Sequence, residues 1–210
     1  MSQYKTIKQN AETEIIEKKS KFIANVVLVT SQEEVENELV HIRKKYFDAS
    51  HHCFAYQIGL NNETQRFSDD GEPKGTAGKP ILDVLKGADV KNTLICVTRY
   101  FGGTLLGTGG LVRAYGKAAK EALKTSGIVE KRKVQLFELT MPYTLLGKVQ
   151  YDLNENDYTI REINYQEVVV ALVEVLDGNQ DHFEKWIVDH TNAEITLRRL
   201  AYDYIDFTVL

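Results

Sequence analysis

Two side chains in the first half of the chain are of types that could do covalent or metal chemistry. His51 and Cys53 lie two residues apart, so in a β-strand they point to the same face. The histidine could activate the thiol as a nucleophile, or the pair could supply two ligands to a metal. No third and fourth ligand can be assigned. A packed cysteine beside a hydrogen-bonded histidine is therefore the structural alternative.

Three carboxylates follow in a segment that is rich in glycine and proline. Asp69, Asp70 and Glu72 lie near the start of a loop of about a dozen residues, from 68 to 80. These carboxylates could hold Mg²⁺, although magnesium sites usually borrow phosphate oxygens from a substrate. Alternatively, they accept hydrogen bonds from N–H groups of the turn. The sequence predicts neither a resident metal nor a cofactor.

A glycine-rich loop suggests a different chemistry, the binding of anions. Five glycines fall within nine residues, between an apolar strand and a helical pattern: Gly102, Gly103, Gly107, Gly109 and Gly110. Such a cluster predicts positive φ angles or a close approach of the backbone to another group. A glycine-rich entry to a helix also exposes N–H groups, which suit phosphate. The order of residues fits neither common nucleotide-binding fingerprint, and the alternative is that the glycines only shape a tight connection.

Positive side chains accompany this loop. Arg99 follows the strand and could grip a phosphate or carboxylate, or pair with one of the three acidic residues before it. Four basic residues are spaced four, three and four apart, which places them on one stripe of the following helix: Arg113, Lys117, Lys120 and Lys124. A merely solvated face would carry interspersed carboxylates, and only Glu121 interrupts this one. The stripe predicts binding of a large anion, of which nucleic acid is the simplest.

The hydrophobic pattern of the first half predicts the elements that position these residues. Strands are expected at residues 13–18, 21–30, 52–60, 64–67 and 94–97, with both faces of the second strand buried. The expected helices are one capped by Ser31 and Glu34, one from Pro80 to Lys86 with Gly87 as its left-handed cap, and one from Leu111 to Gly127.

The last 75 residues alternate between strand and helix patterns. Strands are expected at residues 134–141, 158–164, 167–176 and from 193, with helices at 142–154 and 179–190. This βαββαβ order is that of a ferredoxin-like sandwich, in which two helices cover one face of an antiparallel sheet. Four residues are expected on the buried face of the second helix: Phe183, Trp186, Ile187 and His190.

Composition predicts a folded α+β protein with two domains. Residues 1–135 carry 21 Lys and Arg against 16 Asp and Glu, whereas residues 136–210 carry 5 against 14. We therefore expect one domain at 1–134 and a second at 135–210. No apolar run approaches the roughly 18 residues of a membrane span, the first residues lack the apolar segment of a signal peptide, and the only cysteines are far apart. These features predict a cytoplasmic protein without a membrane partner.

Four motifs follow one another along nearly the whole chain. They are Ser20-Lys21-Phe22; residues 51–56; the acidic loop with Asp69, Asp70, Glu72 and Thr76; and residues 97–115, which hold the glycine cluster. In this succession the chain resembles the IMPACT family, specifically its bacterial YigZ-type members. The resemblance marks eight positions without assigning them a role: Ser20, Lys21, His51, Cys53, Asp69, Asp70, Glu72 and Thr76.

The resemblance implies an architecture like that of translation factors. The N-terminal domain is expected to have the β-α-β-α fold seen in a small-subunit ribosomal protein and in elongation factor G. The second domain is expected to be similar to the last domain of elongation factor G. Eukaryotic relatives bind a partner that activates a stress-responsive initiation-factor kinase, and so modulate translation. For this chain the resemblance implies a partner in translation, which could be RNA, the ribosome or a protein.

Two hypotheses about function follow. The first is a regulatory binding module that contacts RNA or the ribosome through Arg99, the glycine loop and the basic helix. The second is a small enzyme that acts on a phosphorylated or peptide-like substrate among His51, Cys53, Asp69, Asp70, Glu72 and Arg99. The first is favoured because the residues do not form a complete catalytic constellation.

Overall fold

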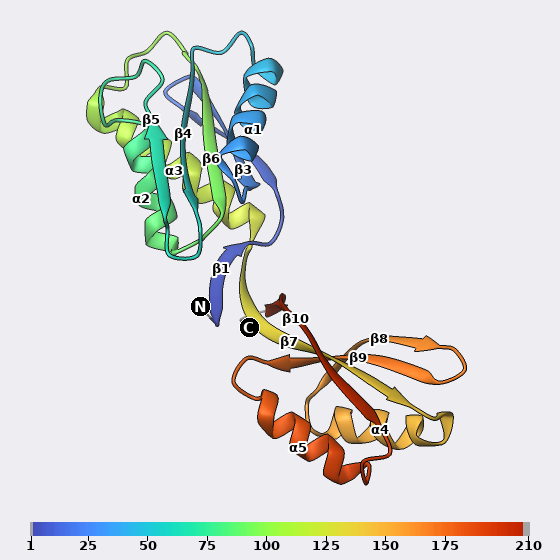
Figure 1. Cartoon of the computed structure of the whole chain (residues 1–210). Coiled ribbons are helices and arrows are strands. Elements are labelled where there is room, and N and C mark those ends of the chain that lie inside the picture. The colour runs from blue at the N-terminus through green and yellow to red at the C-terminus, as the bar shows by residue number, and fades with distance from the viewer. Residues whose placement is uncertain (1, 208–210) are drawn as a thin grey trace. The chain divides into compact units, whose positions relative to one another are not determined.

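The computed structural model describes residues 2–207, which form two compact units (Figure 1). One unit, here the N-terminal domain, comprises residues 4–130, and the C-terminal domain comprises residues 2–3 and 131–207. The described residues contain five helices and ten strands in two five-stranded sheets. The predicted α+β class with two domains is confirmed.

The sheet of the N-terminal domain has the strand order β2-β3-β6-β4-β5, and all of its neighbouring strands are antiparallel. Its strands are β2 (Ala11–Glu17), β3 (Ser20–Leu28), β4 (His51–Ile58), β5 (Thr64–Ser68) and β6 (Thr93–Tyr100). The central strand, β6, is buried along all but its last residue. Its register sets Arg99 opposite Phe22 of β3 on one side and opposite His51 of β4 on the other.

Helices cover both faces of this sheet, as Figure 1 shows. Helix α1 (Gln32–Lys45) packs on one face, against residues such as Ile23 and Leu94, while α2 (Gly78–Ala88) and α3 (Thr108–Ser126) pack on the other, against residues such as Phe22 and Val97. Successive side chains of a strand point to opposite faces, so β3 and β6 are apolar on both. Burial of both faces of the second strand is confirmed.

Helices α2 and α3 both begin earlier than the sequence predicted. Helix α2 begins at Gly78 rather than Pro80 and ends with Asp89 as its left-handed cap at φ 52°, so the assignment of Gly87 as that cap was wrong. Helix α3 begins at Thr108 rather than Leu111, which places Gly109 and Gly110 in its first turn. Local patterns missed both starts because neither helix has a side-chain cap from its own N-cap residue.

The sequence pattern predicted the cap of helix α1 but missed strand β1. The hydroxyl of Ser31 accepts a hydrogen bond from the backbone N–H of Glu34 at 3.2 Å, as expected for the cap of α1. Strand β1 (Gln3–Ile7) was not predicted, since a short strand with mixed polarity gives little periodic signal. It is hydrogen-bonded to β7 (Ile128–Met141), the strand that contains the boundary expected at 134/135.

The C-terminal domain has the predicted βαββαβ order. After β7 come α4 (Tyr143–Glu155), β8 (Thr159–Tyr165), β9 (Val169–Leu176), α5 (Gln180–His190) and β10 (Thr196–Phe207). Four strands of its sheet run β10-β7-β9-β8, the ferredoxin-like arrangement, and β1 pairs with β7 as the fifth strand. Both helices cover the same face of the sheet (Figure 1). Phe183 and Ile187 are buried as expected, but His190 is exposed and lies against the ring of Trp186, with ring centroids 4.9 Å apart.

Candidate functional site

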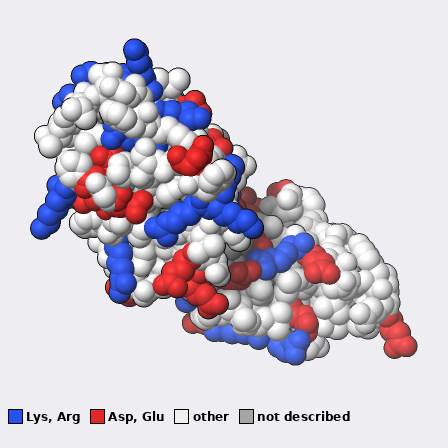
Figure 2. Space-filling model, turned by 90° about the horizontal axis from the view of Figure 1, so that it is seen from above, with Lys and Arg blue, Asp and Glu red and all other residues white. Residues whose placement is uncertain are grey.

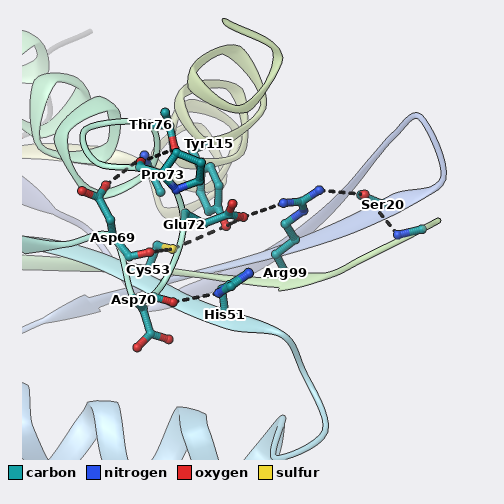
Figure 3. A network of polar contacts seen from close by, with 12 residues as sticks. Ser20, His51, Cys53, Asp69, Asp70, Glu72, Pro73, Thr76, Arg99 and Tyr115 are labelled. Carbon is teal, nitrogen blue, oxygen red and sulfur yellow. Dashed lines mark hydrogen bonds and ion pairs between the residues drawn. The ribbon is translucent and has the colours of Figure 1, made fainter. Parts of the chain in front are cut away.

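A buried polar network links the central strand to the acidic loop and to α3 (Figure 3). Arg99 donates from Nη1 to Oε1 of Glu72 at 2.6 Å, and the hydroxyl of Tyr115 donates to the same oxygen at 2.8 Å. Burial raises the pKa of Tyr115, so its hydroxyl stays protonated and acts as a donor. Arg99 therefore pairs with a carboxylate of its own chain, which was one of the two alternatives left open by the sequence.

Ser20 extends the network to the start of the glycine loop. Its Oγ accepts from Nη2 of Arg99 at 3.3 Å and from the backbone N–H of Gly102 at 3.2 Å. A Cβ at Gly102 would lie 2.0 Å from the carbonyl carbon of Lys19, which leaves no room for a side chain. The close backbone approach predicted from the glycines is thus made to the turn between β2 and β3. Beside this turn, Lys21 lies with its ammonium 4.8 Å from the ring centroid of Tyr100.

The acidic loop is held by its own carboxylates. Asp69 accepts hydrogen bonds from the backbone N–H groups of Gly75, Ala77 and Gly78 at 2.8, 3.1 and 2.9 Å. The last two N–H groups belong to the start of α2, so a residue nine positions away caps this helix. Thr76 adds a bond from its hydroxyl to the carbonyl of Pro73 at 2.7 Å. Asp69 thus has the turn-capping role that the sequence offered as the alternative to magnesium.

His51 and Cys53 fasten the same loop to β4. Nδ1 of His51 lies 2.7 Å from the carbonyl oxygen of Asp70, and the carboxylate of Asp70 accepts from the backbone N–H of His52 at 2.6 Å. The thiol of Cys53 donates to the carbonyl of Asp69 at 3.0 Å and lies 3.4 Å from the hydroxyl of Tyr115. Burial raises the pKa of this thiol far above its ordinary value, so little thiolate is present to act as a nucleophile. The side chains have the packed, hydrogen-bonded arrangement of the structural alternative.

A cleft of about 520 Å³ lies beside this network. Its lining includes His51, Glu72, Arg99 and the start of α3 at Thr108, together with apolar residues of the preceding loop. A carbonyl oxygen can only accept a hydrogen bond, so a neutral His51 carries its proton on Nδ1 and keeps Nε2 as an acceptor. Cys53 does not line the cleft. The cleft joins the predicted histidine and arginine but not the predicted nucleophile.

The glycine loop leads into the start of α3. Positive φ angles occur at Gly103 and Gly107, at 78° and 72°, as the cluster predicted, but not at Gly109 and Gly110, which are helical. Gly107 is the N-cap of the helix and, having no side chain, gives the first turn no side-chain cap of its own. Only part of the cluster thus has the unusual backbone that glycine allows.

The outer face of α3 carries the predicted basic stripe. Its four members are exposed, and within the described part of the chain none forms an ion pair with a carboxylate: Arg113, Lys117, Lys120 and Lys124. The opposite face is buried against the sheet through Tyr115 and small residues. The surface seen from above in Figure 2 carries basic and acidic side chains interspersed.

Tyr115 is the network member whose role the sequence did not indicate. It lies on the side of α3 opposite the basic stripe, and the structure buries it completely. A buried tyrosine needs a partner for its hydroxyl, which is the one signal that pointed beyond packing. The partner, Glu72, lies 43 residues away, and nothing local in the sequence identifies it.

Comparisons with known proteins identify both domains. Residues 18–123 match the model of the Impact N-terminal domain, and residues 139–194 match that of a domain of unknown function, DUF1949. IMPACT family member YvyE of Bacillus subtilis is 39% identical over 206 residues, which cover 98% of this chain and 95% of the relative. The chain belongs to the IMPACT family.

Other members of the family extend this result. IMPACT family member YigZ of Escherichia coli is 36% identical over 184 residues, covering 86% of this chain and 89% of YigZ. The Protein IMPACT homolog of Dictyostelium discoideum is 41% identical over 98 residues, which cover 44% of this chain and 28% of that protein. A crystal structure of a hypothetical protein is 32% identical, with a TM-score of 0.62 over 96% of this chain and 98% of the other.

For this IMPACT family member, the matched N-terminal segment contains the whole polar network from Ser20 to Tyr115. It also contains Arg113, Lys117 and Lys120 of the basic stripe. Among the described residues, no helix is both long and apolar enough to cross a membrane.

Proposed function

We propose that this IMPACT family member is a translation-associated regulatory protein that binds RNA, alone or in the ribosome, through the exposed basic face of α3. The proposal is supported by four cations on one side of a single helix, none of which pairs with a carboxylate of the described residues. From Arg113 to Lys124 the stripe extends over about 16 Å, at about 1.5 Å per residue. Each ammonium or guanidinium that neutralises a phosphate releases a condensed counterion, which favours binding.

The buried network fixes the position of the helix that carries this face. Tyr115, on the inner side of α3, is fixed by its hydrogen bond to Glu72 and by an edge-to-face contact with Phe22, with ring centroids 5.2 Å apart. Glu72 is fixed in turn by Arg99 of the central strand. Because the helix backbone is already positioned, binding orders only the outer side chains and not the backbone. The family motifs thus support the binding face, whereas the basic residues make the contact.

One aromatic residue near the start of α3 could add contacts to bases. Phe101 is 50% exposed and lines the cleft together with Thr108 and Leu111 of the helix. Stacking of a base on an aromatic ring adds affinity for single strands with little sequence preference. Tyr100 is less suited to this role, since its hydroxyl donates to Asp48 at 2.7 Å and its ring is less exposed than that of Phe101.

The enzyme hypothesis has weaker support from the same geometry. A nucleophile at Cys53 would have to be accessible and ionised, whereas this thiol is fully buried and its pKa is raised. Glu72 and Arg99 neutralise each other within the network. His51 keeps Nε2 as an acceptor at the cleft, but one base without a nucleophile does not define a reaction.

Co-sedimentation with ribosomes, paired with fluorescence anisotropy on a single-stranded RNA, tests the proposal. The wild-type chain is expected to bind at about 50 mM salt and to lose most of its affinity by about 200 mM. Exchange of Arg113 and Lys117 for alanine should weaken binding. Lys44→Ala is the matched control, because Lys44 is an exposed lysine of α1 on the other side of the sheet. If wild type binds neither RNA nor ribosomes at low salt, the proposal fails.

A further inference from the structure

An apolar groove of about 860 Å³ lies between α2 and α3 of the N-terminal domain. Its lining recurs at helical spacing on both elements, with Pro80, Val84, Gly87 and Ala88 from α2, and Val112, Gly116, Lys120, Leu123 and Lys124 from α3. Two apolar residues at the groove remain well exposed, Val112 at 41% and Ile128 at 45%. The helices thus pack together but leave an uncovered channel along their outer side.

Two glycines keep this groove open. A Cβ built on Gly87 or Gly116 would meet no atom within 4 Å, and neither residue has a positive φ. A glycine inside a helix costs about 0.5–1 kcal/mol relative to alanine. Neither steric crowding nor backbone conformation explains why these two positions lack a side chain. The space left free beside Gly87 and Gly116 is part of the groove.

The length and the charge of the groove define what would fit. From Val112 to Leu123 the lining extends over about 16 Å, or about three turns of a helix. Lys120 and Lys124 of the lining have no carboxylate partner among the described residues. The one carboxylate of the lining, Asp83, is already paired with Lys79 at 3.1 Å. The groove therefore combines an apolar floor with a net positive wall.

We propose that this groove docks an acidic amphipathic helix of a partner protein. The apolar side chains of that helix lie on the floor between Gly87 and Gly116, and its carboxylates face Lys120 and Lys124. Helices with apolar residues at i, i+3, i+4 and i+7 bind such grooves with one face. RNA is a poor occupant because its charged backbone gains nothing from an apolar floor. The basic stripe thus divides, because Lys120 and Lys124 line this groove whereas Arg113 and Lys117 do not.

The test uses the full-length protein and a fluorescent peptide of about 14 residues, with leucines at this helical spacing and glutamates on the flanks. In the variant Gly116→Leu, the leucine side chain fills the groove, and the helix is kept because leucine has a high helix propensity. This variant should bind the peptide about tenfold more weakly, or weaker still. Gly147→Leu is the matched control, since Gly147 lies in α4 and also has no atom near a built Cβ. The control variant should bind as wild type does.

A charge exchange gives an independent readout. The variant Lys120→Glu/Lys124→Glu should lose the acidic peptide and should bind a version of the peptide in which lysines replace the glutamates. No binding of the acidic peptide by wild type at about 1 mM, equal binding by wild type and G116L, or equal binding of both peptides by wild type would each overturn the proposal. Because Arg113 and Lys117 lie outside the groove, their exchange for alanine should weaken RNA binding only, so the two proposals can fail separately.

Discussion

The guanidinium of Arg99 lies 2.6 Å from the carboxylate of Glu72, and both side chains are almost completely buried, at 6% and 4% exposure. The pair joins the end of the central strand to the middle of the acidic loop. Since a third residue, Tyr115, donates to the same carboxylate, the pair also fixes the inner side of α3. It is the point at which the family motifs of the N-terminal domain meet.

Removal of one member of the Arg99–Glu72 pair should destabilise the N-terminal domain strongly. Arg99→Ala leaves the carboxylate of Glu72 buried without its cation, and we expect a loss of about 3–5 kcal/mol in the free energy of unfolding. Unfolding in urea should be followed by far-UV circular dichroism rather than by tryptophan fluorescence, because the only tryptophan, Trp186, lies in the C-terminal domain.

The matched control is an exposed ion pair of the same domain. Lys79 and Asp83 are 59% and 56% exposed, four residues apart on α2, so Lys79→Ala should cost only about 0.3–0.5 kcal/mol. Similar losses for both variants would show that the buried pair does not stabilise the domain.

Both cysteines should be unreactive in the folded protein. Burial raises the pKa of Cys53 and raises that of Cys96 to about 12. A thiol with a raised pKa stays protonated at pH 8, where an exposed thiol with a pKa of about 8.5 is partly ionised. Ellman's reagent at pH 8 should therefore modify neither residue quickly in buffer and both in guanidinium chloride. Rapid reaction of one equivalent in buffer would reopen the hypothesis of a nucleophilic Cys53.

Two glycine-to-alanine exchanges should act in opposite directions. At Gly102 a Cβ would lie 2.0 Å from the backbone of Lys19, so Gly102→Ala should destabilise by at least about 1–3 kcal/mol. At Gly116 the space is free and the residue is helical, so Gly116→Ala should stabilise by about 0.4–1 kcal/mol. Thermal melts followed by circular dichroism compare the two variants. A neutral Gly102→Ala variant would contradict the tight contact with the turn between β2 and β3.

The salt dependence of RNA binding should report the number of phosphates contacted by α3. Each cation that neutralises a phosphate contributes about 0.7 to the slope of log K against log salt for a single strand. Exchange of both Arg113 and Lys117 for alanine should therefore flatten the slope by about 1.4, to a similar degree for every RNA sequence. Anisotropy titrations between about 50 and 200 mM salt measure this slope. An unchanged slope would place the phosphates away from this part of the helix.

The sequence by itself determined the features that depend on neighbouring residues. Helix α1 with its cap at Ser31 and the βαββαβ order of the C-terminal domain both follow from local periodicity and capping. The strands β3 and β6 were recognisable because their residues are apolar on both faces. The stripe of basic residues on α3 was equally readable, since residues three and four apart share one side of a helix.

Tertiary structure alone decided how the chemically interesting residues are used. Glu72 meets Arg99 across 27 residues and Tyr115 across 43, through strand register and helix packing that no local pattern encodes. The same holds for Asp69, which caps α2 from the far end of the loop and thereby moves the start of that helix ahead of Pro80. The groove between α2 and α3 forms only because packing brings the helix face with Gly87 next to the helix face with Gly116. The sequence specifies which side chains are present, but the contribution of each side chain to stability depends on the partners that folding brings within contact distance.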